Sequence, residues 1–308
     1  MSRRFVLAMT LSFVLIGMLG IAFNAWTTGA KSTIYINADG SIDPLTEDIT
    51  SLDNVTYTFT DNINDSIVVL RSNITIDGAE YTLNGTGTGK WAGFTVEGYG
   101  SINVTIQNVN IIGFGVGIGL VSTDDNKILG CTITNNTNGI WGAETMNNTI
   151  SGNVISHNTY GIFFNTVFHT DIYGNNITNN DNGVWLEYST ENKFYHNYFV
   201  DNINQTYVQQ GNPNTWDDGY PPDGIGGNYW SDFPSRYPGV GDIYSGPGQN
   251  ITGSDGFWDG PYENDEDNID NYPIVPEFPS FIVLTLFMIV SILVVTIHKI
   301  SKKLPERS

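Results

Sequence analysis

Residues 146–167, MNNTISGNVISHNTYGIFFNTV, belong to a sequence that repeats every 22 residues, without insertion or deletion, from residue 106 to residue 208. Three other blocks align with it position by position: DDNKILGCTITNNTNGIWGAET from Asp124, FHTDIYGNNITNNDNGVWLEYS from Phe168 and TENKFYHNYFVDNINQTYVQQG from Thr190. A short period that is rich in β-branched residues and punctuated by Asn and Gly indicates a β-solenoid, in which each block forms one coil.

Three apolar columns run through the blocks. The first contains Ile106, Ile128, Ile150, Ile172 and Phe194; the second contains Ile111, Ile133, Ile155, Ile177 and Phe199; the third contains Ile118, Ile140, Ile162 and Val184. Within one block these positions lie about five and seven residues apart, which is incompatible with one helical stripe and fits three short strands separated by turns. The sequence therefore predicts an all-β fold with almost no helix outside the termini.

Two further columns are expected to stabilise the turns. Asparagine occupies one position on four consecutive coils: Asn136, Asn158, Asn180 and Asn202. An inward-facing Asn can hydrogen-bond the identical amide one rung away, about 4.8 Å along the axis, so we expect an asparagine ladder. A glycine column follows three residues later: Gly117, Gly139, Gly161 and Gly183. We expect a turn with a positive φ at each of these glycines.

The two ends of the chain indicate its compartment. Residues 1–30 contain Arg3 and Arg4, then an apolar run from Phe5 to Phe23, which is typical of a secretory signal; an uncleaved anchor is the alternative. Residues 281–297 carry no charge and are followed by a basic tail, which predicts a transmembrane helix; a buried helix of a soluble domain is the alternative. We therefore expect an extracytoplasmic protein anchored to the cytoplasmic membrane.

The charge of the chain is strongly negative. It has 32 acidic and 12 basic residues and a formal net charge of −20, and all acidic residues except Glu277 and Glu306 lie within residues 31–276. Such a field repels nucleic acid, so we exclude a nucleic-acid partner.

Composition divides the remaining chain. We expect an N-terminal cap and irregular coils over residues 31–105, regular coils over residues 106–211, a Trp-, Asp- and Gly-rich C-terminal cap over residues 212–276, and a tail over residues 277–308.

The C-terminal cap contains candidate ligands for calcium, a hard cation that prefers oxygen. The candidates are Asp217, Asp218, Asp223, Asp232, Asp255 and Asp259, with Glu263, Asp265 and Asp267 as an outer group. In the alternative interpretation, which we favour, Asp and Gly form tight turns while Trp216, Trp230 and Trp258 cover the end of the solenoid.

One aromatic column is a candidate binding surface. Trp141, Phe163, Trp185 and Tyr207 recur at one-rung spacing, and each directly follows a position of the third apolar column or its continuation. If the aliphatic residues point inward, the aromatic rings face outward and could stack on the apolar faces of sugars; if the rings point inward, they are core residues.

Several segments together resemble a known family. The repeat NNTISGNVISHNTYGIFF, followed by NTWDDG, GNYWSDF, DGFWDGPY and NYPIV, resembles NosD-type right-handed parallel β-helix proteins, which have a pectin-lyase-like solenoid fold, over residues 33–275. The opening segments IYINADGSID and SNITIDGAEYTLNG are similar to archaeal members. The segment VPEFPSF resembles an archaeal PEF-type sorting signal, which implies processing near residues 276–279 and replacement by an anchor.

The resemblance also implies functions. Some NosD-like proteins are copper-binding accessories, and copper prefers imidazole, thiolate or thioether ligands. In this chain His157, His169, His196 and Cys131 fall in different columns, which favours structural or solvent-facing roles.

Polysaccharide lyases and hydrolases share the β-helix fold, but they need convergent acidic or basic groups. The regular coils show no such cluster, and Asp171 with Lys193 fits a surface ion pair, so we assign no catalytic residue. We expect a non-catalytic surface protein for recognition or scaffolding, with carbohydrate as the leading ligand.

Overall fold

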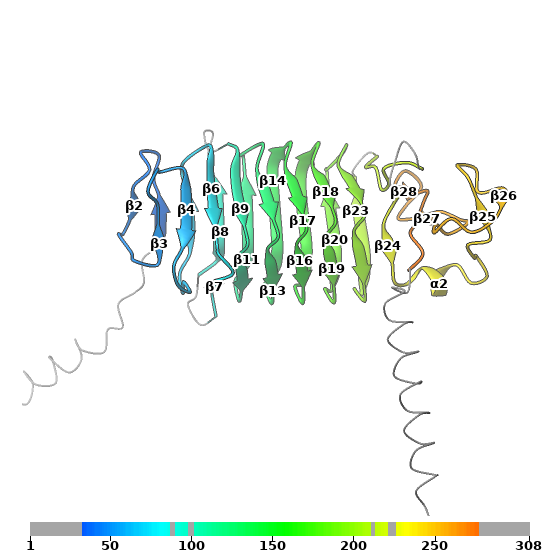
Figure 1. Cartoon of the computed structure of the whole chain (residues 1–308), viewed down its shortest axis with the longest axis horizontal. Helices are drawn as coiled ribbons and strands as arrows, with labels where there is room; N and C mark the ends of the chain where they lie inside the picture. Colours follow the sequence, from blue (N-terminus) through cyan, green and yellow to red (C-terminus); the bar gives the residue numbers. More distant parts are fainter. Residues whose placement is uncertain (1–32, 87–89, 98–101, 211–212, 221–225, 277–308) are drawn as a thin grey trace, which may run out of the picture.

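The computed structural model describes residues 33–86, 90–97, 102–210, 213–220 and 226–276. Within these residues the chain coils into an elongated rod, along which the strands run side by side (Figure 1). Most strands belong to three parallel sheets, which we call A, B and C. The predicted all-β solenoid is confirmed: the one helix in the described part of the chain is α2 (Phe233–Arg236).

The three sheets have nine, eight and seven strands. Sheet A consists, in order, of β2 (Ile42–Asp43), β1 (Ile34–Ile36), β5 (Ile67–Val69), β8 (Ala92–Glu97), β11 (Val116–Val121), β14 (Asn138–Met146), β17 (Tyr160–Phe168), β20 (Asn182–Glu187) and β23 (Asn204–Gln209). Sheet B consists of β3 (Ile49–Thr50), β4 (Thr56–Phe59), β6 (Ile74–Asp77), β9 (Val104–Gln107), β12 (Lys127–Leu129), β15 (Thr149–Ser151), β18 (Asp171–Tyr173) and β21 (Lys193–Tyr195). Sheet C consists of β7 (Thr82–Asn84), β10 (Asn110–Ile112), β13 (Thr132–Thr134), β16 (Val154–Ser156), β19 (Asn176–Thr178), β22 (Tyr198–Val200) and β24 (Tyr229–Trp230).

The 22-residue period is the length of one coil. Ile128 pairs with Ile106 on one side and with Ile150 on the other, and the other two sheets keep the same register. Since successive side chains of a strand point to opposite faces, each apolar column lies on one face of its sheet. Ile150, Ile155 and Ile162 are fully buried, so the three columns meet in the interior of the rod.

The first coils differ in length from the regular ones: Tyr57 of β4 pairs with Ile76 of β6, which is 19 residues further along the chain. Ile74 of β6 pairs with Val104 of β9, which lies 30 residues further along the chain. At the N-terminal end β2 and β3 run antiparallel to their neighbours, which ends the parallel stacking of sheets A and B.

Three asparagine ladders join successive coils. In the predicted ladder, the amide oxygen of Asn158 accepts hydrogen bonds from the backbone N–H of Asn136 at 2.9 Å and from its side-chain Nδ2 at 3.2 Å. Asn180 accepts the equivalent bonds from Asn158, and Asn202 accepts them from Asn180. The second ladder runs through Cys131, Asn153, Asn175, Asn197 and Asn228. The third has two segments, one that joins Asn126 to Asn148 and one that runs from Thr170 through Asn192 and Asn214 to Asn268.

The glycine column has a different role from the one expected. Gly117, Gly139, Gly161 and Gly183 lie inside strands of sheet A and do not adopt positive φ, so that prediction was wrong. A Cβ atom on Gly139 would lie 2.5 Å from the carbonyl oxygen of Gly161. Glycine is required there because two backbones approach closely, whereas another glycine column, Gly130, Gly152 and Gly174, does adopt positive φ.

The cap closes the C-terminal end with stacked aromatic rings. Trp216 stacks on Phe194 and Trp230 stacks on Phe199, each at 4.3 Å between ring centroids, and Tyr262 stacks on Trp230 at 4.0 Å. Trp258 is partly buried and stacks on Phe233 of α2. Trp216 and Trp230 therefore cover the last coil. The cap also contains two hairpins, β25 (Tyr244–Ser245) with β26 (Ile251–Thr252) and β27 (Tyr262–Glu263) with β28 (Ile269–Asp270).

The expected signal segment and C-terminal membrane helix lie outside the described residues. Among the helices of the described part of the chain, none is long and apolar enough to cross a membrane.

Candidate functional site

The predicted aromatic column lies on the outer face of sheet A. Trp141, Phe163, Trp185 and Tyr207 stand in register on β14, β17, β20 and β23. The preceding residues Ile140, Ile162 and Val184 are fully buried, whereas the rings are partly exposed and Tyr207 is 42% exposed. The aromatic side chains therefore belong to the surface of the rod.

Two further rings extend this column. Trp91 precedes β8, is 59% exposed and meets Trp141 edge to face at 5.5 Å between centroids. Tyr160 lies 5.5 Å from Phe163 and 5.4 Å from Trp185. We call the six residues Trp91, Trp141, Tyr160, Phe163, Trp185 and Tyr207 the aromatic strip.

The two ends of the strip present their rings differently. Trp185 and Tyr207 stack on each other at 4.0 Å, so each covers one face of the other. Trp91 and Trp141 come from coils on either side of β11 and meet above it. A Cβ atom on Gly115 would lie 3.2 Å from Cδ1 of Trp91, and one on Gly119 would lie 3.8 Å from Cε3 of Trp141. Because these glycines have no side chain, both indoles reach over the β11 coil.

A polar column accompanies the strip. Two residues beyond Phe163, Trp185 and Tyr207, the strands carry Asn165, Glu187 and Gln209 in register. One carboxylate oxygen of Glu187 accepts a hydrogen bond from Nε1 of Trp185 at 3.0 Å, and the other accepts one from Nδ2 of Asn165 at 2.9 Å. Two residues of strand span about 6.6 Å, so hydrogen-bonding groups stand beside the rings at roughly the width of a sugar ring.

The aspartates proposed for calcium do not converge in the described part of the chain. No group of three or more His, Cys, Asp or Glu that could hold a metal occurs among the described residues, and Asp223 lies outside them. The other five aspartates have partners in the protein. Asp217 accepts hydrogen bonds from Gly219 and Asn271, Asp232 accepts them from Tyr262, and Asp218 forms an ion pair with Lys193. Asp255 accepts hydrogen bonds from Gly246, Gln249 and Phe257, and Asp259 accepts them from Ile243 and Tyr244. The column of the repeat had suggested an ion pair between Lys193 and Asp171, but the structure pairs Lys193 with Asp218.

The outer acidic group also serves the cap. Asp265 accepts hydrogen bonds from the backbone N–H of Asp267 and from Nδ2 of Asn268, while Glu263 is exposed on β27. Asn268 in turn ends the third ladder.

The residues that could bind copper are separated by the fold. His157 lies between β16 of sheet C and β17 of sheet A, His169 between β17 and β18 of sheet B, and His196 between β21 of sheet B and β22 of sheet C. The three described histidines therefore occupy the three different corners of the coil. Cys131 is buried, and burial raises the pKa of its thiol to about 12, which disfavours a thiolate ligand. These residues do not fit a copper site.

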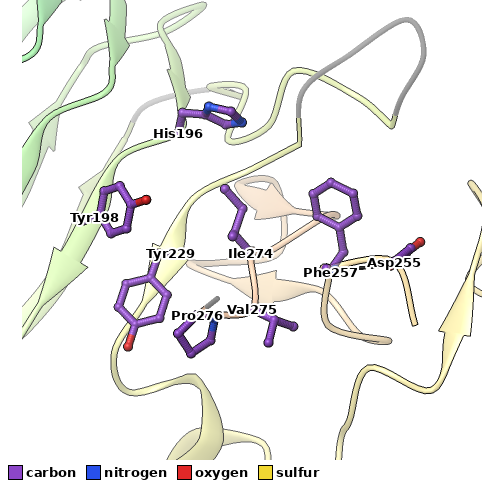
Figure 2. A pocket seen from close by; sticks show the side chains of 9 residues that line it. His196, Tyr198, Tyr229, Asp255, Phe257, Ile274, Val275 and Pro276 are labelled. Carbon is purple, nitrogen blue, oxygen red and sulfur yellow. Dashed lines mark hydrogen bonds between the residues drawn. The ribbon is translucent and has the colours of Figure 1, made fainter. Parts of the chain in front are cut away.

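A separate pocket of about 550 Å³ lies between sheet C and the cap (Figure 2). Tyr198 and Tyr229 form one side, Ile274 to Pro276 and Phe257 form the other, and His196 lies at the edge. The pocket is on a different sheet from the aromatic strip, so the two surfaces are independent.

Sequence reasoning missed several residues of these surfaces. Trp91 precedes the regular repeat, and Tyr160 lies three residues before Phe163 in a column whose other members are not aromatic. The sequence does contain a sign of the arrangement of Trp91 and Trp141. Alternate residues of GFGVGIGLV, residues 113–121, are glycine, so the β11 coil lacks side chains beneath these two rings.

Comparison with solved structures finds proteins of low similarity. The first is ORF18 of Geobacillus virus E2, with 17% identity and a TM-score of 0.30 over 52% of this chain and 40% of that one. The A-modules of the Azotobacter vinelandii mannuronan C-5 epimerases AlgE6 and AlgE4 have 14% and 12% identity and TM-scores of 0.23, over 53% and 57% of this chain and 62% and 78% of theirs. The chain thus spans less than two thirds of the first two structures. Among curated proteins, none matches significantly.

A family comparison is more informative. Residues 24–235 match the family described as "Periplasmic copper-binding protein (NosD)", and this segment contains all the regular coils and the start of the cap. The match spans well over half of the sequence, and the parallel solenoid agrees with the fold implied by the repeat. The chain belongs to the NosD family.

Proposed function

We propose that the protein is a non-catalytic, extracytoplasmic recognition or scaffolding rod that binds carbohydrate on the outer face of sheet A. The observation that carries this proposal is the aromatic strip, in which Trp91 and Tyr207 are exposed and the other four rings are partly exposed along one face of the solenoid. Large aromatic side chains on a surface usually indicate a binding site, because they are costly to leave in water.

The geometry of the strip suits a chain of sugars. The rungs are about 4.8 Å apart, close to the length of one pyranose unit in an extended chain, so a glycan lying along the rod would meet similar groups at each step. Apolar sugar faces would pack on the rings, while hydroxyl groups would hydrogen-bond to Asn165, Glu187 and Gln209. Since the strands are held by ladders on both sides, the site is preorganised and little ordering entropy is lost on binding.

The proposed location is the cell surface or a periplasm-like space. The description of the family as periplasmic supports an extracytoplasmic site. We propose in addition that residues 1–30 direct export and that residues 277–308 anchor the protein to the cytoplasmic membrane, either as a helix or after PEF-type processing.

The copper-binding alternative is supported by the family description. The described histidines on three corners and the buried Cys131 argue against it for this chain. A polysaccharide lyase or hydrolase is the other alternative, but Glu187, the carboxylate that contacts a ring of the strip, already accepts hydrogen bonds on both of its oxygens.

A binding experiment tests the proposal. The purified full chain is titrated with a panel of soluble polysaccharides by isothermal calorimetry, alongside Trp185→Ala and a control, Tyr195→Ala, which removes a ring from the outer face of sheet B. We expect at least one polysaccharide to bind, Trp185→Ala to weaken it about tenfold and Tyr195→Ala to leave it unchanged. If the two variants weaken polysaccharide binding equally, the outer face of sheet A is not the binding surface.

A further inference from the structure

The charged side chains around the aromatic strip are mainly acidic. The nine strands of sheet A contain no Lys or Arg, and their exposed or partly exposed charged side chains include Glu97 on β8, Glu144 on β14 and Glu187 on β20. Lys90 lies just before β8, but its Nζ is 3.1 Å from a carboxylate oxygen of Asp65. The field over the strip is therefore negative.

We infer that the strip takes glycans without carboxylate or sulfate groups, and that the Trp91–Trp141 pair above the glycines of β11 is its principal subsite. This inference rests on the proposed carbohydrate-binding function and specifies its ligand. It has two independent grounds, the shape of the β11 coil and the charge around the strip.

The shape argument concerns which ring faces are free. At the C-terminal end of the strip, Trp185 and Tyr207 are stacked, so each ring has one face covered by the other ring. At the other end, Trp91 and Trp141 meet edge to face, which leaves a ring face open, and Trp91 is the most exposed ring of the strip. The missing side chains at Gly115 and Gly119 allow the pair to lie low over the sheet. A sugar ring can therefore stack at this end.

The charge argument concerns the ligand. A uronate carboxylate that lies about 8 Å from a glutamate in water experiences a repulsion that weakens binding about twofold. Three such glutamates along the strip would weaken an anionic chain by up to about tenfold, and added salt would reduce this penalty. A neutral chain escapes the penalty and can donate hydroxyl hydrogens to Glu187.

The test compares matched oligosaccharides on the full chain by isothermal calorimetry, in low salt and with EDTA. Cellohexaose and mannohexaose are the neutral probes, and hexagalacturonate and hexamannuronate are the anionic ones. We expect binding of at least one neutral probe and, for the anionic probes, binding that is weaker by up to about tenfold and improves with salt. The double variant Glu97→Gln/Glu144→Gln is expected to strengthen anionic binding about fourfold and to leave neutral binding unchanged.

Two glycine variants test the subsite. A Cβ on Gly119 makes contacts of 3.7 Å or longer, so Gly119→Ala should bind normally, whereas the larger side chain of Gly119→Leu should displace Trp141 and weaken binding at least tenfold. Melting temperatures of both variants verify that they fold. Anionic probes that bind as tightly as neutral ones would overturn the inference and leave the proposed function intact. If no probe of either kind binds, both the proposed function and this inference are wrong. If Gly119→Leu folds and binds normally, the Trp91–Trp141 pair is not the principal subsite.

Discussion

Replacing one ladder asparagine should destabilise the rod strongly. The side chain of Asn158 takes part in four hydrogen bonds: its oxygen accepts from the backbone and side-chain nitrogens of Asn136, and its Nδ2 donates to the oxygen of Ile133 at 3.1 Å and to that of Asn180 at 3.1 Å. Asn158 is 3% exposed, so water cannot replace these partners in Asn158→Ala. At about 1 kcal/mol for each bond, the free energy of unfolding should fall by about 4 kcal/mol.

The assay is urea unfolding of the full chain followed by tryptophan fluorescence. A loss of about 4 kcal/mol lowers the midpoint by more than about 1 M when the slope is 1–3 kcal/mol per M. The control is Asn176→Ala, which removes an exposed asparagine from β19 and should change stability by less than about 0.5 kcal/mol. If Asn158→Ala is no more destabilising than this control, the ladder does not stabilise the fold as argued.

Three further predictions concern the coil contacts, the cap and metals. Gly139→Ala places a Cβ 2.5 Å from a backbone oxygen and should cost about 1–3 kcal/mol in urea unfolding, whereas Gly119→Ala should cost less than about 1 kcal/mol; equal costs would refute the close-approach argument. Burial raises the pKa of Asp270 from 3.8 to about 7, so the native state binds this proton more tightly than the unfolded state, and stability should fall as pH rises from about 4 to about 7. Asp270→Asn should flatten that slope, which can reach about 1.4 kcal/mol per pH unit, and an unchanged slope would assign it to other groups. EDTA should leave the melting temperature unchanged, because Asp217, Asp232, Asp255 and Asp259 already accept hydrogen bonds and Asp218 pairs with Lys193; a calcium-reversible drop would show that a cation stabilises the cap.

The coils could be predicted from the repeat because the same requirement, burial of apolar side chains inside the rod, acts on every coil. Equal spacing puts Ile106 beside Ile128 and Ile111 beside Ile133, and burial then decides which face they occupy. The same logic predicted the outward rings. It did not predict the conformation of Gly139, because a carbonyl oxygen of the next coil, and not a turn, excludes its side chain.

The ends of the ladders could not be predicted from the period. The second ladder passes from Asn197 to Asn228 and ends on Asp270, whose carboxylate also accepts from Nε1 of Trp230 at 2.8 Å. These partners are 31 and 42 residues apart, so the cap supplies by irregular loops the groups that another coil would have supplied. Trp91 was not included in the predicted column for a similar reason, since the early coils depart from the 22-residue length.

The central claim is that one face of the rod binds sugar, and oxidative footprinting of the full chain tests it most directly. Hydroxyl radicals modify exposed aromatic rings, and mass spectrometry measures the rate at each residue with and without a glycan that binds. We predict protection of Trp91, Trp141 and Tyr207, and unchanged rates at Tyr198 and Tyr229 in the pocket of sheet C. Protection of the pocket tyrosines with the strip still reactive would contradict the account.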